Sequence, residues 1–70
     1  MVKIDSFKLL LERGKSGLTI KELSEKAGVS VSTIVHLEHG QPNGSLLTIG
    51  KIARAFEIDP LKLIRQEVKS

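Results

Sequence analysis

The feature that most constrains this 70-residue sequence is a very short break between two helical segments. Apolar residues at helical spacing run up to Ala27, and a second helical pattern begins at Val31. Only Gly28, Val29 and Ser30 separate them. Glycine favours the left-handed conformation that ends many helices, and serine is a strong N-cap residue. A turn this short forces the two segments to cross steeply, with Val29 as its apolar plug.

The rest of the chain has the pattern of further short helices separated by turn-forming residues. Thr19 and Glu22 have the spacing of a capping box, and Ser45 can cap the segment after the glycine-rich loop. Asp59 and Pro60 are typical of the start of a last helix. We therefore expect an all-α bundle in a single domain over residues 1–70, with five helices at about 4–13, 20–27, 31–38, 46–56 and from 60 onward.

The apolar stripes of these segments predict which side chains face inward. The expected inward residues are Ile4, Phe7, Leu10, Leu11, Leu23, Ala27, Ile34, Leu37, Leu46, Ile49, Ile52, Ala53, Phe56, Leu61 and Ile64. Leu9 is expected on a flank of the first helix, and Ile58 beneath the last turn.

Composition excludes several function classes. The chain has no cysteine, so neither a disulfide nor a thiolate zinc site can stabilise it. No apolar run approaches the roughly 20 residues that span a bilayer, and the first residues lack the apolar stretch of a signal peptide. We expect a cytoplasmic protein with no membrane partner. Eleven basic and eight acidic residues give a net charge of +3, which permits a nucleic-acid partner without requiring one.

Neither a metal site nor catalysis is expected. His36 and His39 lie three residues apart, a spacing that can hold a metal, but no third ligand is evident nearby. The segment Gly14-Lys15-Ser16 is similar to the end of a phosphate-binding loop, yet Leu9 stands where that motif needs its first glycine. No histidine has an evident acid and nucleophile around it. We expect no enzyme activity, no metal and no cofactor.

Two features leave alternatives open. Gly50 lies inside a predicted helix, where glycine costs roughly 1 kcal/mol relative to alanine. It either allows a close approach of another helix or is simply tolerated. The last helix carries Leu61, Leu63, Ile64 and Val68, which cannot all face one small core. Leu63 or Val68 could therefore be exposed, and Leu47 likewise. Scattered exposed leucines are normal in proteins, and a self-association face is the alternative.

An ordered set of residues along most of the chain resembles a known family. It comprises Leu18-Thr19-Ile20-Lys21-Glu22-Leu23, Ala27-Gly28-Val29-Ser30, Ser32-Thr33-Ile34, Leu37-Glu38-His39-Gly40, Ser45-Leu46, Thr48-Ile49, Ile52-Ala53, Phe56 and Ile58. This set resembles the Cro/C1-type (phage repressor-like, Xre) helix-turn-helix DNA-binding domains, over about residues 4–64. The resemblance implies a compact five-helix lambda-repressor-like bundle, with the helix-turn-helix at the second and third helices.

The resemblance also implies roles for individual positions. The third helix would lie in the major groove of DNA. The positions that match the base-reading sites are Val31, Ser32, Val35 and His36. Those expected near phosphates are Thr19, Ile20, Lys21, Thr33, His39, Gln41 and Asn43. Ile20 replaces the usual glutamine, so only its backbone N–H is available there. Arg13 and Glu38 fall on the positions of a structural pair that ties the first helix to the third.

This chain departs from the family in the charge of its reading region. From Ala27 to Gly50 there is no lysine or arginine, and Glu38 is the only formal charge. Cations on phosphates supply most non-specific DNA affinity, so we expect modest affinity. Val31 and Val35 could contact thymine methyl groups, or they could merely flank the core.

Together these observations favour a sequence-specific transcriptional regulator that binds double-stranded DNA. We expect it to act alone or as a homodimer on a partly palindromic operator. In a homodimer the two reading helices would be one DNA turn apart, roughly 34 Å. The alternative is a protein-interaction or antitoxin-like accessory module with the same fold and a protein partner. DNA affinity that falls steeply with salt would distinguish the regulator from the interaction module.

Overall fold

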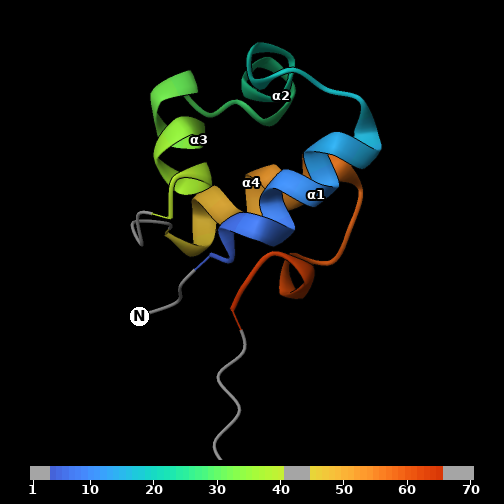
Figure 1. The fold of residues 1–70 in the computed structure, drawn as a ribbon, viewed down its shortest axis with the longest axis vertical. Coiled ribbons are helices and arrows are strands. Elements are labelled where there is room, and N and C mark those ends of the chain that lie inside the picture. The colour runs from blue at the N-terminus through green and yellow to red at the C-terminus, as the bar shows by residue number, and fades with distance from the viewer. Residues whose placement is uncertain (1–3, 41–44, 66–70) are drawn as a thin grey trace, which may run out of the picture.

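The computed structural model describes residues 4–40 and 45–65. Over these residues the chain forms the helices α1 (Ser6–Ser16), α2 (Ile20–Ala27), α3 (Val31–Glu38) and α4 (Leu46–Phe56), followed by a single 3-10 turn, η1 (Pro60–Lys62). In Figure 1, α1 crosses in front of α4, α2 and α3 lie above them, and η1 lies below. The all-α fold class is confirmed. The prediction of a fifth α-helix is wrong for the described residues, because from residue 60 to residue 65 the chain makes only the 3-10 turn.

Helix boundaries follow from local capping. Asp5 starts α1 by accepting hydrogen bonds from the N–H groups of Phe7 (3.0 Å) and Lys8 (3.2 Å). Ser45 starts α4 by accepting from Thr48 N–H at 3.1 Å. The first helix runs past Gly14, so its predicted end was wrong. It ends at Gly17, whose φ of 69° is left-handed.

The core forms where the four α-helices meet. Its buried apolar residues are Ile4, Leu9, Leu23, Ile34, Leu37, Ile49, Ile52, Ala53, Ala55, Phe56 and Leu63. Ala27, Val29, Ile58 and Ile64 are partly buried against this cluster, together with Leu18 and Ile20. The inward faces predicted for α2 and α3 are therefore confirmed, as is the role of Val29 in the turn.

The inward face predicted for α1 was wrong. Phe7, Leu10 and Leu11 are exposed, and Leu9 is fully buried in their place. The reason is that Ile4 precedes the helix and pairs with Ile64 in an antiparallel bridge. Ile4 is buried as expected, but because it is not helical, a helical stripe cannot be counted from it.

Two more residues that were predicted to face inward are exposed, and both lie near the ends of helical segments. Leu46 is 68% exposed because it occupies the first position of α4, beyond the edge of the core. Leu61 is exposed and Leu63 is buried, because the 3-10 turn does not keep the spacing of an α-helix. Leu47 is exposed.

Candidate nucleic-acid interface

The α2–turn–α3 unit is built from two capped helices joined by a left-handed glycine. At the start of α2, Thr19 Oγ1 accepts from the Glu22 N–H at 3.1 Å, and the Glu22 carboxylate accepts from the Thr19 N–H at 2.9 Å. Gly28 ends α2 with a φ of 71°. At the start of α3, Ser30 Oγ accepts from the Thr33 N–H at 3.2 Å. Both caps and the glycine turn confirm what the sequence predicts for this segment.

A side-chain hydrogen bond fixes the turn itself. The Ser24 hydroxyl donates to the carbonyl oxygen of Val29, and the Val29 N–H donates back to the Ser24 carbonyl at 3.1 Å. This role of Ser24 was not predicted from the sequence. A serine one helical turn before a C-terminal glycine can bond to nearby backbone, which was the available signal. Two bonds between the same residues hold the angle between α2 and α3.

One face of α3 is anchored and the other is free. Ile34 and Leu37 are fully buried, so they fix the rotation of the helix about its axis. Val31, Ser32 and His36 are exposed on the outer side. A helix of about 10 Å diameter with side chains fits the major groove of B-DNA. The arrangement can therefore present three small or flat side chains to base edges.

The two valines proposed for base reading differ in exposure. Val31 is exposed, whereas Val35 is half-buried. Neither belongs to the apolar residues that pack against the core cluster. This placement favours an outward role over the alternative in which both valines simply flank the core.

The residues expected near phosphates fall into three groups. Thr19 and Lys21 are exposed at the start of α2, where the N–H groups of the first turn lack carbonyl partners within the helix. Ile20 packs its side chain against the core, so only its N–H faces outward. Thr33 is half-buried, and its hydroxyl lies 2.8 Å from Ser30 Oγ within the cap.

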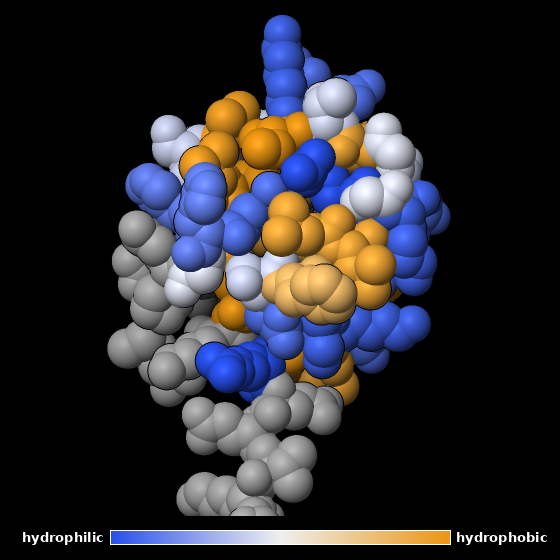
Figure 2. All heavy atoms as spheres, viewed as in Figure 1, coloured by the Kyte–Doolittle hydropathy of each residue, from blue (hydrophilic) through white to orange (hydrophobic). Residues whose placement is uncertain are grey.

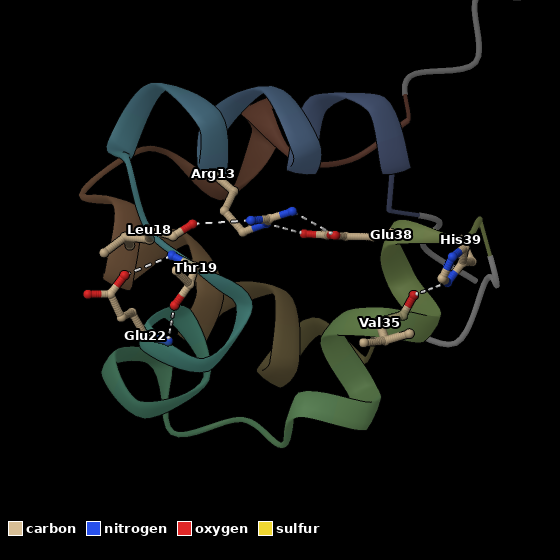
Figure 3. A network of polar contacts seen from close by, with 7 residues as sticks. All are labelled: Arg13, Leu18, Thr19, Glu22, Val35, Glu38 and His39. Carbon is tan, nitrogen blue, oxygen red and sulfur yellow. Dashed lines mark hydrogen bonds and ion pairs between the residues drawn. The ribbon is translucent and has the colours of Figure 1, made fainter.

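The remaining candidates lie at or after the end of α3. His39 is exposed, with Nδ1 2.9 Å from the Val35 carbonyl oxygen, so its Nε2 is the nitrogen left for a ligand (Figure 3). Gln41 and Asn43 lie outside the described residues. Among the described residues, no group of three or more His, Asp or Glu side chains could hold a metal ion.

Within the α2–turn–α3 unit, α3 is close to neutral, whereas α2 carries exposed charges. The Arg13 guanidinium pairs with the Glu38 carboxylate, with Nε to Oε2 at 2.6 Å, as Figure 3 shows. The structural pair suggested by the resemblance is thus brought together, and it neutralises the one formal charge of α3. Exposed Lys21 and Lys26 lie on α2. At the α2 cap, hydrogen bonds from Thr19, first from its backbone N–H and then from its side chain, lower the pKa of Glu22 below its usual value.

No helix in the described part of the chain is long and apolar enough to cross a bilayer.

Comparisons with known proteins agree with this geometry. A family model described as "Helix-turn-helix" (HTH_3) matches residues 8–63. An uncharacterized HTH-type transcriptional regulator of Archaeoglobus fulgidus is 52% identical over 44 residues, which are 63% of this chain and 63% of that protein. The chain thus matches somewhat less than two thirds of that relative's length.

Two solved structures share the fold. The restriction-modification controller protein C.AhdI from Aeromonas hydrophila superposes with a TM-score of 0.77 at 33% identity, covering 81% of this chain and 86% of that one. A hydroxyethylphosphonate dioxygenase contains a similar unit, with a TM-score of 0.82 at 19% identity, covering 96% of this chain and 14% of the enzyme. The second similarity shows the fold alone.

Proposed function

This chain belongs to the HTH_3 helix-turn-helix family, and we propose that it is a transcriptional regulator that binds double-stranded DNA through the outer face of α3. The observation that carries this proposal is the orientation of α3. Buried Ile34 and Leu37 on one side turn Ser32 and His36 to solvent on the other. A serine hydroxyl and an imidazole both hydrogen-bond to base edges, and exposed Val31 suits a thymine methyl group.

Backbone groups and α2 would position the protein on the duplex. The first-turn N–H groups of Ile20 and Lys21 point along the axis of α2 and favour an anion. Lys21 and Lys26 add the cations that α3 lacks. We infer a modest electrostatic share in binding, because few cations lie near the reading helix. We further propose that the chain acts in the cytoplasm, where its DNA partner would lie.

We also propose that the protein binds DNA as a homodimer through α4 and η1. A groove of about 500 Å³ lies on this side of the molecule. Its lining residues are Leu46, Leu47, Gly50, Lys51, Ala53, Arg54, Ile58 and Pro60. Leu46 and Leu47 are largely exposed at its edge, as is Leu61 on η1. A second copy would remove this apolar surface from water.

The open space around Gly50 supports the proposal that α4 contacts a second copy. A Cβ atom built on Gly50 meets nothing within 4 Å, so the packing of the described residues does not require glycine there. Glycine nevertheless costs roughly 1 kcal/mol in a helix interior. Of the two explanations that the sequence leaves open, we favour close approach, by a helix of a second copy rather than of the same chain.

The charges around the groove suit a second copy. Lys51 and Arg54 lie along α4, and exposed Glu57 and Asp59 follow at its end. In a two-fold contact, the same surface of both subunits is used, and the two surfaces run in opposite directions. The cations of one subunit can then face the carboxylates of the other.

The test of DNA binding is selection from a randomised duplex library at low salt, followed by sequencing. Two enriched half-sites about one helical turn apart would support a dimeric regulator, and one half-site a monomeric reader. Absence of any enrichment, with helicity confirmed by circular dichroism, would contradict DNA reading.

A second candidate function is supported by the neutral face of α3. The absence of lysine and arginine from residue 27 to residue 50 favours a protein-interaction module, for example an antitoxin-like accessory subunit. Such a module should bind duplex DNA weakly at every salt concentration. A regulator should lose affinity steeply as salt rises.

A further inference from the structure

The outer side of α1 carries an apolar stripe that the core does not use. Phe7, Leu10 and Leu11 are 70%, 42% and 49% exposed. Their spacing of three and four residues places them on one helical face. Figure 2 shows an apolar patch near the centre of this side of the molecule, over α1 and bordered by hydrophilic side chains.

The apolar stripe is followed, one helical turn later, by a glycine with open space around it. Gly14 follows Leu10 and Leu11 by four and three residues, and a Cβ atom there would meet nothing within 4 Å. A helical face with large apolar residues at i, i+3 and i+4 and a small residue at i+7 is typical of faces that pack against another helix. The face therefore fits a helix better than an extended strand.

The charge beside the stripe is positive. Lys8 lies three residues before Leu11 and Lys15 four residues after it, so both border the apolar face. The Glu12 side chain is only 14% exposed and lies 3.4 Å from Lys15. The Asp5 carboxylate is the N-cap of α1 and accepts hydrogen bonds from the N–H groups of Phe7 and Lys8. Lys15 is therefore the exposed charge at this edge of the stripe, and Lys8 lies half-buried beside it.

This charge decides between the two kinds of helical partner. A second copy docked on the same face would place lysines against lysines, unlike the α4–η1 face with its charges of both signs. We infer that the α1 face docks an amphipathic helix of a different protein, with carboxylates beside its apolar stripe. Figure 3 shows Arg13 of α1 reaching Glu38 of α3. The stripe is on the exposed side of α1, so we infer that the partner and DNA can be bound together. This inference does not depend on DNA binding.

The test uses two synthetic helical peptides with the same leucines at i, i+3, i+4 and i+7. One carries glutamates beside the leucines and the other carries lysines. The isotope-labelled full chain is titrated with each, and amide shifts are followed by NMR. We expect the glutamate peptide to shift amides of α1 and to bind about tenfold more tightly than the lysine peptide.

Three variants make the result specific. Leu10→Ser should weaken the glutamate peptide about tenfold, because a buried leucine contact is lost. The double variant K8E/K15E should invert the preference between the peptides. Leu47→Ser, on the α4–η1 face, is the matched control and should change neither affinity. Circular dichroism checks that each variant is folded.

Several outcomes would overturn the inference. They are equal affinity for the two peptides, no shifts in α1, or shifts that gather on α4 and η1. Dissociation of a dimer by Leu10→Ser would instead identify the α1 face as the contact between copies, which also contradicts it. The duplex selection is a separate measurement, so failure here leaves the proposed DNA function untouched.

Discussion

The guanidinium of Arg13 holds the Glu38 carboxylate in a two-pronged contact, with Nε to Oε2 at 2.6 Å and Nη2 to Oε1 at 3.2 Å. The same guanidinium donates to the carbonyl oxygen of Leu18 at 3.2 Å. One side chain thus joins α1, the entry to α2 and the last residue of α3. The side chain of Glu38 is only 8% exposed, so the contact is well shielded from water.

Removal of Arg13 should therefore destabilise the fold. We expect Arg13→Ala to lower the free energy of unfolding by about 1–3 kcal/mol, because it leaves a largely buried carboxylate unpaired. Urea denaturation followed by circular dichroism measures this. The matched control is Lys15→Ala, which breaks the exposed contact with Glu12 and should cost under about 1 kcal/mol. Equal costs for both variants would show that the Arg13 contact has no special role.

The fold could be predicted from the sequence where local capping signals set the ends of the helices. Thr19, Gly28 and Ser30 have side-chain or backbone properties that act within a few residues, so α2, its turn and α3 could be predicted closely. The burial of Leu9 could not, because it depends on Ile4 leaving the helix to pair with Ile64, which lies 60 positions away in sequence. Tertiary contacts of this kind leave no local pattern.

The candidate site was predictable to a similar extent. The outward orientation of Ser32 and His36 follows from the buried positions of Ile34 and Leu37 on the same helix. The half-buried state of Thr33 and its place in the Ser30 cap were not evident from spacing.

Base reading by α3 predicts a change in sequence preference when its outer residues are altered. Ser32→Ala and His36→Ala should each relax selectivity at one base position, at a cost of about 1–3 kcal/mol for the preferred base. Fluorescence anisotropy with labelled duplexes from the selection measures this. Lys21→Ala is the contrasting variant, because a phosphate contact carries no base information. It should weaken all duplexes similarly and reduce the salt slope by about 0.9. Identical profiles for the three variants would contradict base reading by α3.

The capping box predicts a pH dependence of stability. Hydrogen bonds from Thr19 lower the pKa of Glu22 in the folded state, so the ionised form is favoured by folding. Its contribution is present above the unfolded-state pKa and is lost as pH falls through the folded-state value. Glu22→Gln keeps a hydrogen-bond acceptor but cannot ionise. The stability difference between the parent chain and Glu22→Gln should therefore shrink as pH falls below about 4.5, the usual value for glutamate. Parallel pH curves from urea melts would show that ionisation of Glu22 does not stabilise the cap.

The end of α4 offers a stabilising change. Glu57 adopts a left-handed conformation with a φ of 59°, which is unfavourable for a residue with a side chain. Glu57→Gly should raise the free energy of unfolding by about 0.5–1 kcal/mol, since glycine is the usual residue at such a C-terminal position. Gly17→Ala is the converse variant at a φ of 69°, and it should destabilise by about 1 kcal/mol. Thermal melts that show the same sign for both substitutions would contradict the assignment of backbone strain at Glu57.

The groove of α4 and η1 predicts a contact between copies that substitution can weaken. Leu47 is 71% exposed, so Leu47→Glu should leave the fold intact while placing a charge in the proposed apolar contact. We expect this variant to raise the dimer dissociation constant at least about tenfold, from the lost burial of one leucine. Sedimentation with interference optics is the suitable measurement, because the chain has no tryptophan or tyrosine to absorb at 280 nm.

Gly50 provides a second, independent probe of the same contact. Gly50→Ala fills open space in a helix interior, so it should stabilise the monomer by up to about 1 kcal/mol. If a second copy approaches Gly50 closely, the added methyl group should at the same time weaken the dimer. Phe7→Ser, on the α1 face, is the control and should change the dissociation constant little. A parent chain that stays monomeric at all concentrations, or a dimer that Leu47→Glu and Gly50→Ala leave unchanged while Phe7→Ser dissociates it, would exclude this groove as the dimer contact.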